Sequence, residues 1–171
     1  MSKATEKLTR AAHGVLGRLP TAARRSLTQR YFRLRRAKTL GVRGLVLNER
    51  EHVLLIRHTY QPGWMLPGGG VEKGETAEEA LAHELRDEAG IRLTARPTLF
   101  GIYDNRAVFP EDHVLLYVIR PGQYARLDWQ PNAEIAEMGF FAPDALPEGT
   151  TAGTQRRIAE VLQGREPAQL W

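Results

Sequence analysis

Residues 69–91 read GGVEKGETAEEALAHELRDEAGI, the most informative stretch of this chain. The first residues are rich in glycine and predict a loop, whereas alanine and leucine recur at helical spacing after Thr76. Threonine is favourable at the start of a helix and glycine just past its end. The stretch therefore predicts a loop followed by a helix that begins at Thr76 and stops at Gly90.

The predicted helix carries three acidic side chains on one face. Glu84 and Glu88 are four residues apart and Asp87 is three residues from Glu84, so the carboxylates lie within about 6 Å of one another. Hard divalent cations such as Mg²⁺ or Mn²⁺ prefer carboxylate oxygens and would relieve the repulsion between these charges. Leu81 and Leu85 lie nearer the buried side, so we expect part of the acidic face to border a cleft.

Short apolar segments surround the loop and the helix. Segments 41–47 and 52–56 flank the polar turn 48–51 and predict a hairpin. Three further strands and then a last helix are expected at residues 92–102, 113–120, 138–141 and 152–163. Strands that alternate with two helices predict an α/β domain with a mixed sheet.

Composition narrows the class of protein. With 171 residues, 42% hydrophobic and 26% charged, the chain is long enough for one globular domain and a modest appendage. It has no cysteine, which excludes disulfides and thiolate metal sites, so any metal must bind to oxygen or imidazole. Long apolar runs and a signal peptide are absent from the sequence, and we therefore expect a cytoplasmic protein.

Charge divides the chain into two parts. Residues 1–38 carry eleven lysines and arginines against the single acid Glu6, a net charge of +10, whereas the remainder carries −6. Their apolar residues recur at helical spacing, which predicts a basic amphipathic helical extension before a domain of residues 39–171. The extension is interpreted in two ways: it binds RNA or an anionic membrane surface, or it packs on the domain or on a second subunit of a homodimer.

The stretch of residues 69–91 resembles the Nudix box, whose pattern is G-x5-E-x7-R-E-U-x-E-E-x-G-U, with U an aliphatic residue. Seven positions match in register, namely Gly69, Glu75, Glu84, Leu85, Glu88, Gly90 and Ile91. The resemblance covers roughly residues 41–163 and implies a Nudix-type α/β/α sandwich with a mixed sheet.

The resemblance also implies an activity, the metal-dependent hydrolysis of a pyrophosphate bond in a nucleoside diphosphate linked to another group. By residue match, Glu84 and Glu88 would be catalytic ligands of Mg²⁺ or Mn²⁺, and the carbonyl of Gly69 would be a further ligand. Glu75 would orient the loop or assist proton transfer. Glu134 lies at a spacing where some family members place another glutamate that faces the metal.

Two positions depart from the family pattern. His83 stands where the family has an arginine and is the candidate orienting residue, although it is shorter and only partly charged near neutral pH. Asp87 replaces the first of the paired glutamates and is one methylene shorter, so a metal at this position is bound directly, is held through water or is absent, which leaves the number of metals open. These departures keep a second function class open, a catalytically weak Nudix-fold sensor that binds a nucleotide.

Residues outside the acidic helix are candidates for substrate binding. Gly68 and Gly70 allow close approach of a phosphate, and Arg57, near the end of a strand, is a candidate phosphate contact. One of three aromatic residues is expected to stack on a base: Tyr103, Phe109 or Trp129. Three histidines lack metal-ligand spacing and are interpreted as strand-end or surface residues: His52, His58 and His113.

Overall fold

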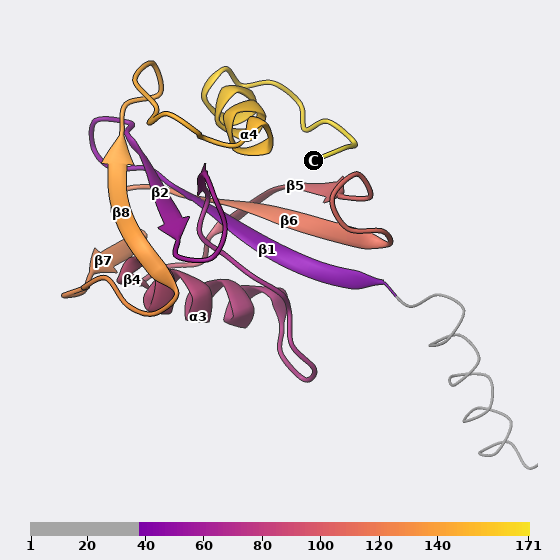
Figure 1. Cartoon of the computed structure of the whole chain (residues 1–171), viewed down its shortest axis with the longest axis horizontal. Coiled ribbons are helices and arrows are strands. Elements are labelled where there is room, and N and C mark those ends of the chain that lie inside the picture. Colours follow the sequence, from indigo (N-terminus) through magenta and orange to yellow (C-terminus); the bar gives the residue numbers. More distant parts are fainter. Residues whose placement is uncertain (1–37) are drawn as a thin grey trace, which may run out of the picture. The chain divides into compact units, whose positions relative to one another are not determined.

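The computed structural model describes residues 38–171 (Figure 1), so the helices predicted for the basic extension lie outside the described residues. The described part contains two helices and three small sheets. None of its helices is long and apolar enough to cross a membrane.

The first sheet is mixed, as the sequence predicts. Its strand β1 (Thr39–Val46) pairs in parallel with β6 (Asp112–Ile119). Strand β6 in turn pairs in antiparallel fashion with β5 (Thr98–Asp104), so the strand order is β1-β6-β5.

The second sheet positions the functional site. Its central strand β2 (Val53–His58) is antiparallel to both β3 (Trp64–Met65) and β8 (Ile135–Phe141). A separate antiparallel pair joins β4 (Ile91–Leu93) to β7 (Tyr124–Arg126). The pairing of β2 with β8 brings the end of one strand beside the start of the other.

Helix α3 (Ala77–Ala89) confirms the helix predicted from local signals. The Thr76 hydroxyl accepts the backbone N–H of Glu79, and the Glu79 carboxylate accepts the backbone N–H of Thr76, a reciprocal cap. Gly90 ends the helix in the left-handed conformation with φ 57°. Leu81 and Leu85 are fully buried, so the rotation of the helix about its axis is fixed.

The two helices pack on opposite faces of the sheet that contains β1 (Figure 1). Successive side chains of β1 point to opposite faces, so this strand contributes to both cores. Val42 and Val46 belong to the core that includes Leu85 of α3. Leu45 belongs to a second core that includes Ile158 of the last helix, α4 (Ala152–Leu162). The predicted mixed sheet with two helices is therefore confirmed.

Three predicted strand features need correction. The hairpin prediction for segments 41–47 and 52–56 is wrong, because β1 pairs with β6 and meets β2 only through an isolated bridge between Leu47 and Val53. The strand predicted over residues 92–102 is two strands, β4 and β5, separated by a segment containing Pro97, which cannot donate a ladder hydrogen bond. Strand β8 begins three residues earlier than predicted.

Candidate active site

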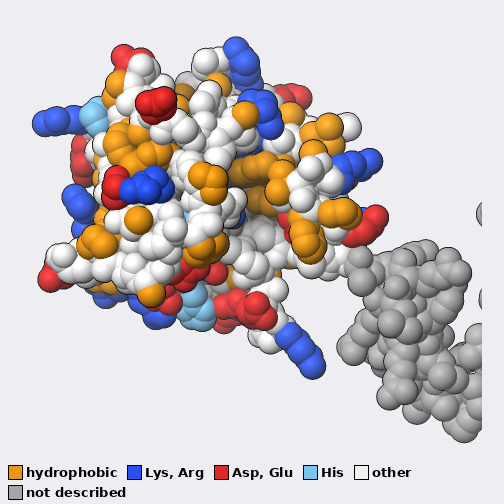
Figure 2. Space-filling view, in the orientation of Figure 1, with side chains coloured by type: hydrophobic (Ala, Val, Ile, Leu, Met, Phe, Trp, Pro, Cys, Tyr) orange, Lys and Arg blue, Asp and Glu red, His pale blue; other side chains and the backbone are white. Residues whose placement is uncertain are grey.

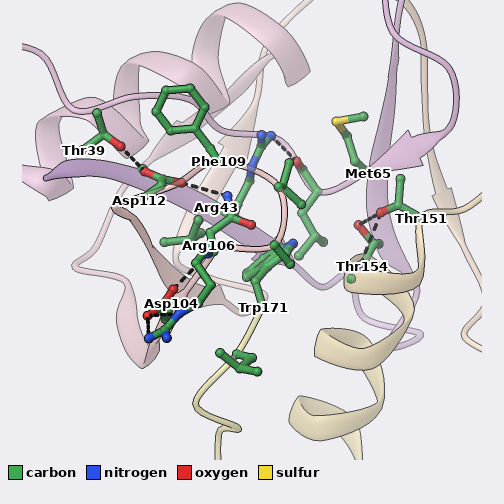
Figure 3. Close-up of a pocket in the computed structure, with 18 of the residues that line it drawn as sticks. Thr39, Arg43, Met65, Asp104, Arg106, Phe109, Asp112, Thr151, Thr154 and Trp171 are labelled. Atoms are coloured by element: carbon green, nitrogen blue, oxygen red, sulfur yellow. Dashed lines mark hydrogen bonds and ion pairs between the residues drawn. The ribbon is translucent and has the colours of Figure 1, made fainter.

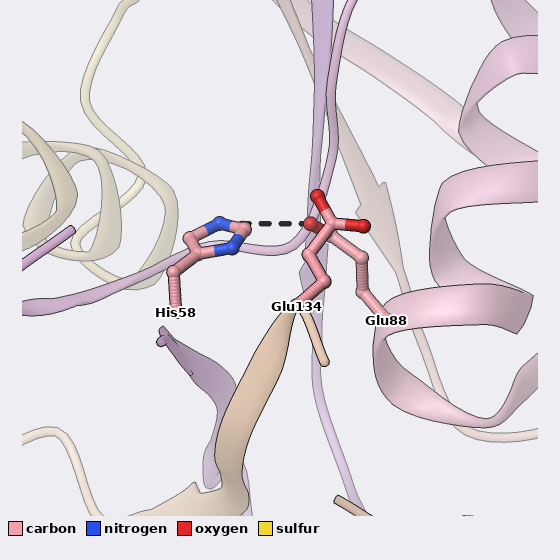
Figure 4. Close-up of side chains that lie close together, drawn as sticks. All are labelled: His58, Glu88 and Glu134. Atoms are coloured by element: carbon pink, nitrogen blue, oxygen red, sulfur yellow. Dashed lines mark ion pairs between the residues drawn. The ribbon is translucent and has the colours of Figure 1, made fainter. Parts of the chain in front are cut away.

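Three segments far apart in sequence meet at the end of β2 (Figure 4). His58 ends β2, Glu88 comes from α3, and Glu134 lies in the loop before β8. One nitrogen or oxygen atom from each of them lies within 4.8 Å of the other two. His58 and Glu88 are only 5% and 4% exposed, whereas Glu134 is exposed. This group can hold a metal ion.

Glu88 is held by the glycine loop that precedes α3. Its Oε2 accepts the backbone N–H of Gly68 at 2.7 Å. Burial raises the pKa of Glu88 to about 7, and this effect outweighs the hydrogen bond from Gly68 and the positive charge of Arg43, which lower it. The charge of Arg43 therefore does not fully offset the burial of this carboxylate, and a bound cation would supply further positive charge.

The raised pKa of Glu88 predicts a pH-dependent stability of the metal-free protein. The folded-state pKa of about 7 exceeds the ordinary value of 4.5, so the contribution of the protonated group is full below about pH 4.5 and lost as pH rises through 7. The free energy of unfolding of the metal-free protein falls by about 3 kcal/mol over this range. Urea unfolding in the presence of a chelator measures the free energy of unfolding of the wild type and of Glu88→Gln at pH 5 and pH 8. The wild type should lose stability relative to Glu88→Gln between these two pH values. A difference that does not change with pH would contradict it.

Glu84 lies against the same glycine loop. A Cβ atom added at Gly69 would overlap the Glu84 carboxylate, so only glycine leaves room for this side chain in its present position. Glu84 is half-buried, and burial raises its pKa, against an opposing effect of Arg43. The loop therefore brings its backbone into contact with both matching glutamates of the box, Glu84 and Glu88.

Replacement of Gly69 tests this arrangement. Gly69→Ala should displace the Glu84 carboxylate and lower kcat by about 10-fold or more, since misplacing a catalytic group by an ångström costs on that order or more. Steady-state kinetics measure the effect, and circular dichroism with thermal unfolding verifies the fold. A folded Gly69→Ala protein with the wild-type rate would mean that the position of Glu84 is not critical.

Glu75 and His83 form a pair on the exposed side of α3. The Nδ1 atom of His83 lies 2.6 Å from Oε1 of Glu75, and the other carboxylate oxygen accepts the backbone N–H of Glu72 at 3.2 Å. His83 thus contacts one of the box carboxylates. Figure 2 shows acidic side chains and a histidine gathered over α3 and the loop before it.

Asp87 and Arg57 also lie outside the His58–Glu88–Glu134 group, and each is engaged by another side chain. Asp87 is exposed, and its carboxylate accepts a hydrogen bond from Nε of Arg86 at 2.8 Å. Arg57 forms an ion pair with Glu137 on the neighbouring strand β8. The three acidic residues predicted on one helical face therefore differ in surroundings: Glu88 is buried, Glu84 is half-buried, and Asp87 faces solvent.

Two polar residues at the site were not identified from the sequence. Arg43 on β1 donates a hydrogen bond from Nη1 to the carbonyl of Leu66 at 2.9 Å, and its charge acts on both Glu84 and Glu88. A charged residue within the apolar segment 41–47 was the signal that could have revealed it. His58 ends a strand, one of the two predicted positions, but nothing in the sequence indicated that its imidazole is buried beside Glu88.

A cleft of about 640 Å³ shares Arg43 and Gly69 with the surroundings of this site (Figure 3), but its lining does not include His58, Glu84, Glu88 or Glu134. Arg43, Gly69 and Gly70 line it near the carboxylates, and Phe109 and Trp171 line it further away. Phe109 is exposed, whereas the other two aromatic candidates do not line this cleft. The cleft therefore combines a positive charge and backbone near the carboxylates with aromatic rings suited to a planar group.

Comparison with known proteins places the chain in a family. The sequence model of the NUDIX domain matches residues 37–162. The chain is 33% identical over 128 residues to a Bacillus subtilis (strain 168) protein with a provisionally assigned 8-oxo-dGTP diphosphatase activity, covering 75% of this chain and 83% of the relative. It is 33% identical over 90 residues to an ADP-ribose pyrophosphatase of Methanocaldococcus jannaschii, covering 51% of this chain and 52% of that protein.

A solved structure agrees with these matches. The MutT NUDIX hydrolase of Burkholderia pseudomallei superposes with a TM-score of 0.58 at 26% identity, covering 72% of this chain and 98% of the other. The chain belongs to the NUDIX domain family and is a Nudix-type pyrophosphohydrolase acting on acid anhydrides.

Proposed function

We propose that this chain hydrolyses the pyrophosphate bond of a nucleoside diphosphate linked to another group, with Mg²⁺ or Mn²⁺ bound by Glu84, Glu88, Glu134 and the carbonyl of Gly69. The observation that carries the proposal is the contact of both matching glutamates with the glycine loop, whose residues Gly69 and Gly70 also line the cleft. The donor set fits the group, because these cations prefer oxygen ligands and the charge of Arg43 does not fully offset the burial of Glu84 and Glu88.

The surrounding residues have distinct roles in this proposal. When bound, the cation supplies charge neutralisation of the pyrophosphate and activation of a water molecule. Arg43 presents a positive charge to phosphate oxygens in the cleft, and Gly70 leaves its backbone open to them. Glu75, held by His83, or the exposed Glu134 accepts the proton of the attacking water.

Three further candidate residues are already engaged by other groups of the protein. Asp87 would act on the metal through water, since its carboxylate is engaged by Arg86. Arg57 would reach phosphate only by leaving its ion pair with Glu137. Gly68 contributes by donating its N–H to Glu88, which leaves that amide engaged and not free for phosphate.

The substrate class follows from the cleft and from the relatives. A cleft of about 640 Å³ lies within the range of small-molecule sites and has room for a nucleoside. Phe109 offers an exposed aromatic ring for stacking on a base. The named relatives are a provisionally assigned 8-oxo-dGTP diphosphatase and an ADP-ribose pyrophosphatase, and both of these nucleotides carry a phosphoanhydride bond. We therefore propose a nucleotide-type substrate.

A substrate panel tests the proposal. The purified full chain is incubated with Mg²⁺ or Mn²⁺ and with 8-oxo-dGTP, dGTP, ADP-ribose, a dinucleotide, a nucleotide sugar and capped RNA, and products are separated by chromatography. We expect at least one member to release a nucleoside monophosphate, with kcat/KM on the order of 10⁴ M⁻¹s⁻¹ or higher. Saturable nucleotide binding with no product from any member would instead favour the sensor function.

A further inference from the structure

His58 is a buried polar residue without an evident partner. Within residues 38–171, its Nδ1 atom has no hydrogen-bond partner, and its Nε2 atom lies 3.6 Å from Oε1 of Glu88, too far for a good hydrogen bond. Burying a polar group without hydrogen bonds costs free energy of about 1–3 kcal/mol. The Nε2 atom is thus the nitrogen that lies closest to the Glu88 carboxylate, at a distance longer than a hydrogen bond.

The backbone around His58 fixes its position relative to Glu134. The N–H of Thr59 donates to the carbonyl of Glu134 at 2.8 Å, and the Thr59 hydroxyl donates to the carbonyl of Ala133 at 2.8 Å. The Tyr60 ring lies 4.9 Å from the imidazole, and its hydroxyl donates to Oε1 of Glu134 at 3.3 Å. These contacts fasten the end of β2 to the loop before β8, so the imidazole and both carboxylates converge (Figure 4).

We propose that His58 is a metal ligand, whose imidazole nitrogen joins the carboxylates of Glu88 and Glu134 in binding the cation. This inference rests on the proposed function, because it concerns the same cation. It adds a nitrogen ligand that neither the sequence motif nor the family resemblance assigns, and it replaces a set of oxygen donors by a mixed set.

The distances support this assignment. Ligand atoms lie about 2.1 Å from Mg²⁺, so two ligands of one such ion are separated by at most about 4.2 Å. The Nε2 and Oε1 atoms of His58 and Glu88, 3.6 Å apart, already meet this limit. The group as a whole spans up to 4.8 Å, and the exposed Glu134 side chain can turn to close the remaining gap of about 0.6 Å. Burial and the charge of Arg43 lower the pKa of His58, which favours the neutral form needed in a ligand.

The mixed donor set predicts which cation binds. Mg²⁺ prefers oxygen ligands and keeps several waters, whereas Mn²⁺ and later divalent ions accept imidazole nitrogen as well as carboxylate oxygen. We therefore expect this chain to bind Mn²⁺ more tightly than Mg²⁺ by about 10-fold or more, and His58 to cause most of the difference.

The test measures metal binding and not activity. Isothermal titration of the full chain gives the Kd for Mn²⁺ and for Mg²⁺ in the wild type, in His58→Gln and in the control His52→Gln, whose position lies at the turn between β1 and β2. We expect His58→Gln to weaken Mn²⁺ binding by about 10-fold or more and Mg²⁺ binding by less than about 3-fold. The control should leave both constants unchanged.

A second measurement needs no variant. Pulsed electron paramagnetic resonance of the Mn²⁺-loaded wild type should show modulation from a directly bound imidazole nitrogen, and this decides the question even if His58→Gln fails to fold. Mn²⁺ binding without nitrogen modulation, or with equal losses for both metals in His58→Gln, would overturn the assignment and leave the proposed hydrolysis standing. If neither Mn²⁺ nor Mg²⁺ binds the wild type, both proposals are overturned.

Discussion

Replacing Glu88 by glutamine is expected to lower kcat by about 10²- to 10³-fold, the scale of losing one essential electrostatic group. Glutamine has the same shape and can still accept the N–H of Gly68, which now donates at 2.7 Å. It carries no charge, however, and cannot balance a divalent cation. The fold should persist, because a neutral amide is cheaper to bury than a carboxylate. Steady-state kinetics with an accepted nucleotide measure the loss.

The same helix supplies a matched control. Glu78→Gln makes the identical chemical change on α3, but Glu78 pairs with the exposed Arg96 at 2.7 Å and has no contact with the loop of Gly68. Its kcat should stay within about twofold of the wild type, since an exposed ion pair contributes only about 0–1 kcal/mol. Similar rates in Glu88→Gln and Glu78→Gln would contradict the role of Glu88.

Gly68→Ala should destabilise the fold by about 4 kcal/mol. Gly68 has φ 137°, a conformation that residues with a Cβ rarely adopt, and an added Cβ would overlap the carbonyl oxygen of Val42. Backbone strain costs about 1–3 kcal/mol, and overpacking costs a similar amount. Because the N–H of Gly68 also holds Glu88, activity should fall together with stability. Urea unfolding at neutral pH measures the first effect.

A substitution at Gly74 distinguishes backbone strain from overpacking as the cause of the stability loss in Gly68→Ala. Gly74 also has positive φ, 91°, but nothing lies within 4 Å of an added Cβ. Gly74→Ala therefore introduces the backbone strain alone and should cost about 1–2 kcal/mol. Equal losses at both positions would show that the contact between Gly68 and Val42 is not close enough to matter.

Helix α3 could be predicted because its signals are local. Thr76 and Gly90 cap its ends, and the spacing of Leu81 and Leu85 sets its buried side, so the common face of the acidic residues follows from the sequence. The difference in burial between the adjacent residues Asp87 and Glu88 could not be predicted in the same way. Tertiary packing decides which of two neighbouring carboxylates is buried, and no helical spacing encodes it.

The failed predictions concern contacts between distant segments. The turn after β1 is real, but β1 finds its partner in β6, more than sixty residues away, so the hairpin pattern was misleading. His58 looked like an ordinary strand end, because the loop that brings Glu134 close to it is separated from β2 in the sequence by helix α3 and five strands. Arg43 was visible as a charge within an apolar strand, and such a position is a usable signal of a functional site.

Hydrolysis in ¹⁸O-labelled water tests the central claim most directly. An accepted nucleotide is cleaved by the full chain with Mg²⁺ or Mn²⁺, and the products are analysed by mass spectrometry and ³¹P nuclear magnetic resonance. We predict that one product phosphate gains an oxygen from water at each cleavage and that a chelator stops the reaction. Cleavage without incorporation of the label into phosphate, or unchanged cleavage in the chelator, would contradict metal-dependent attack of water on the pyrophosphate.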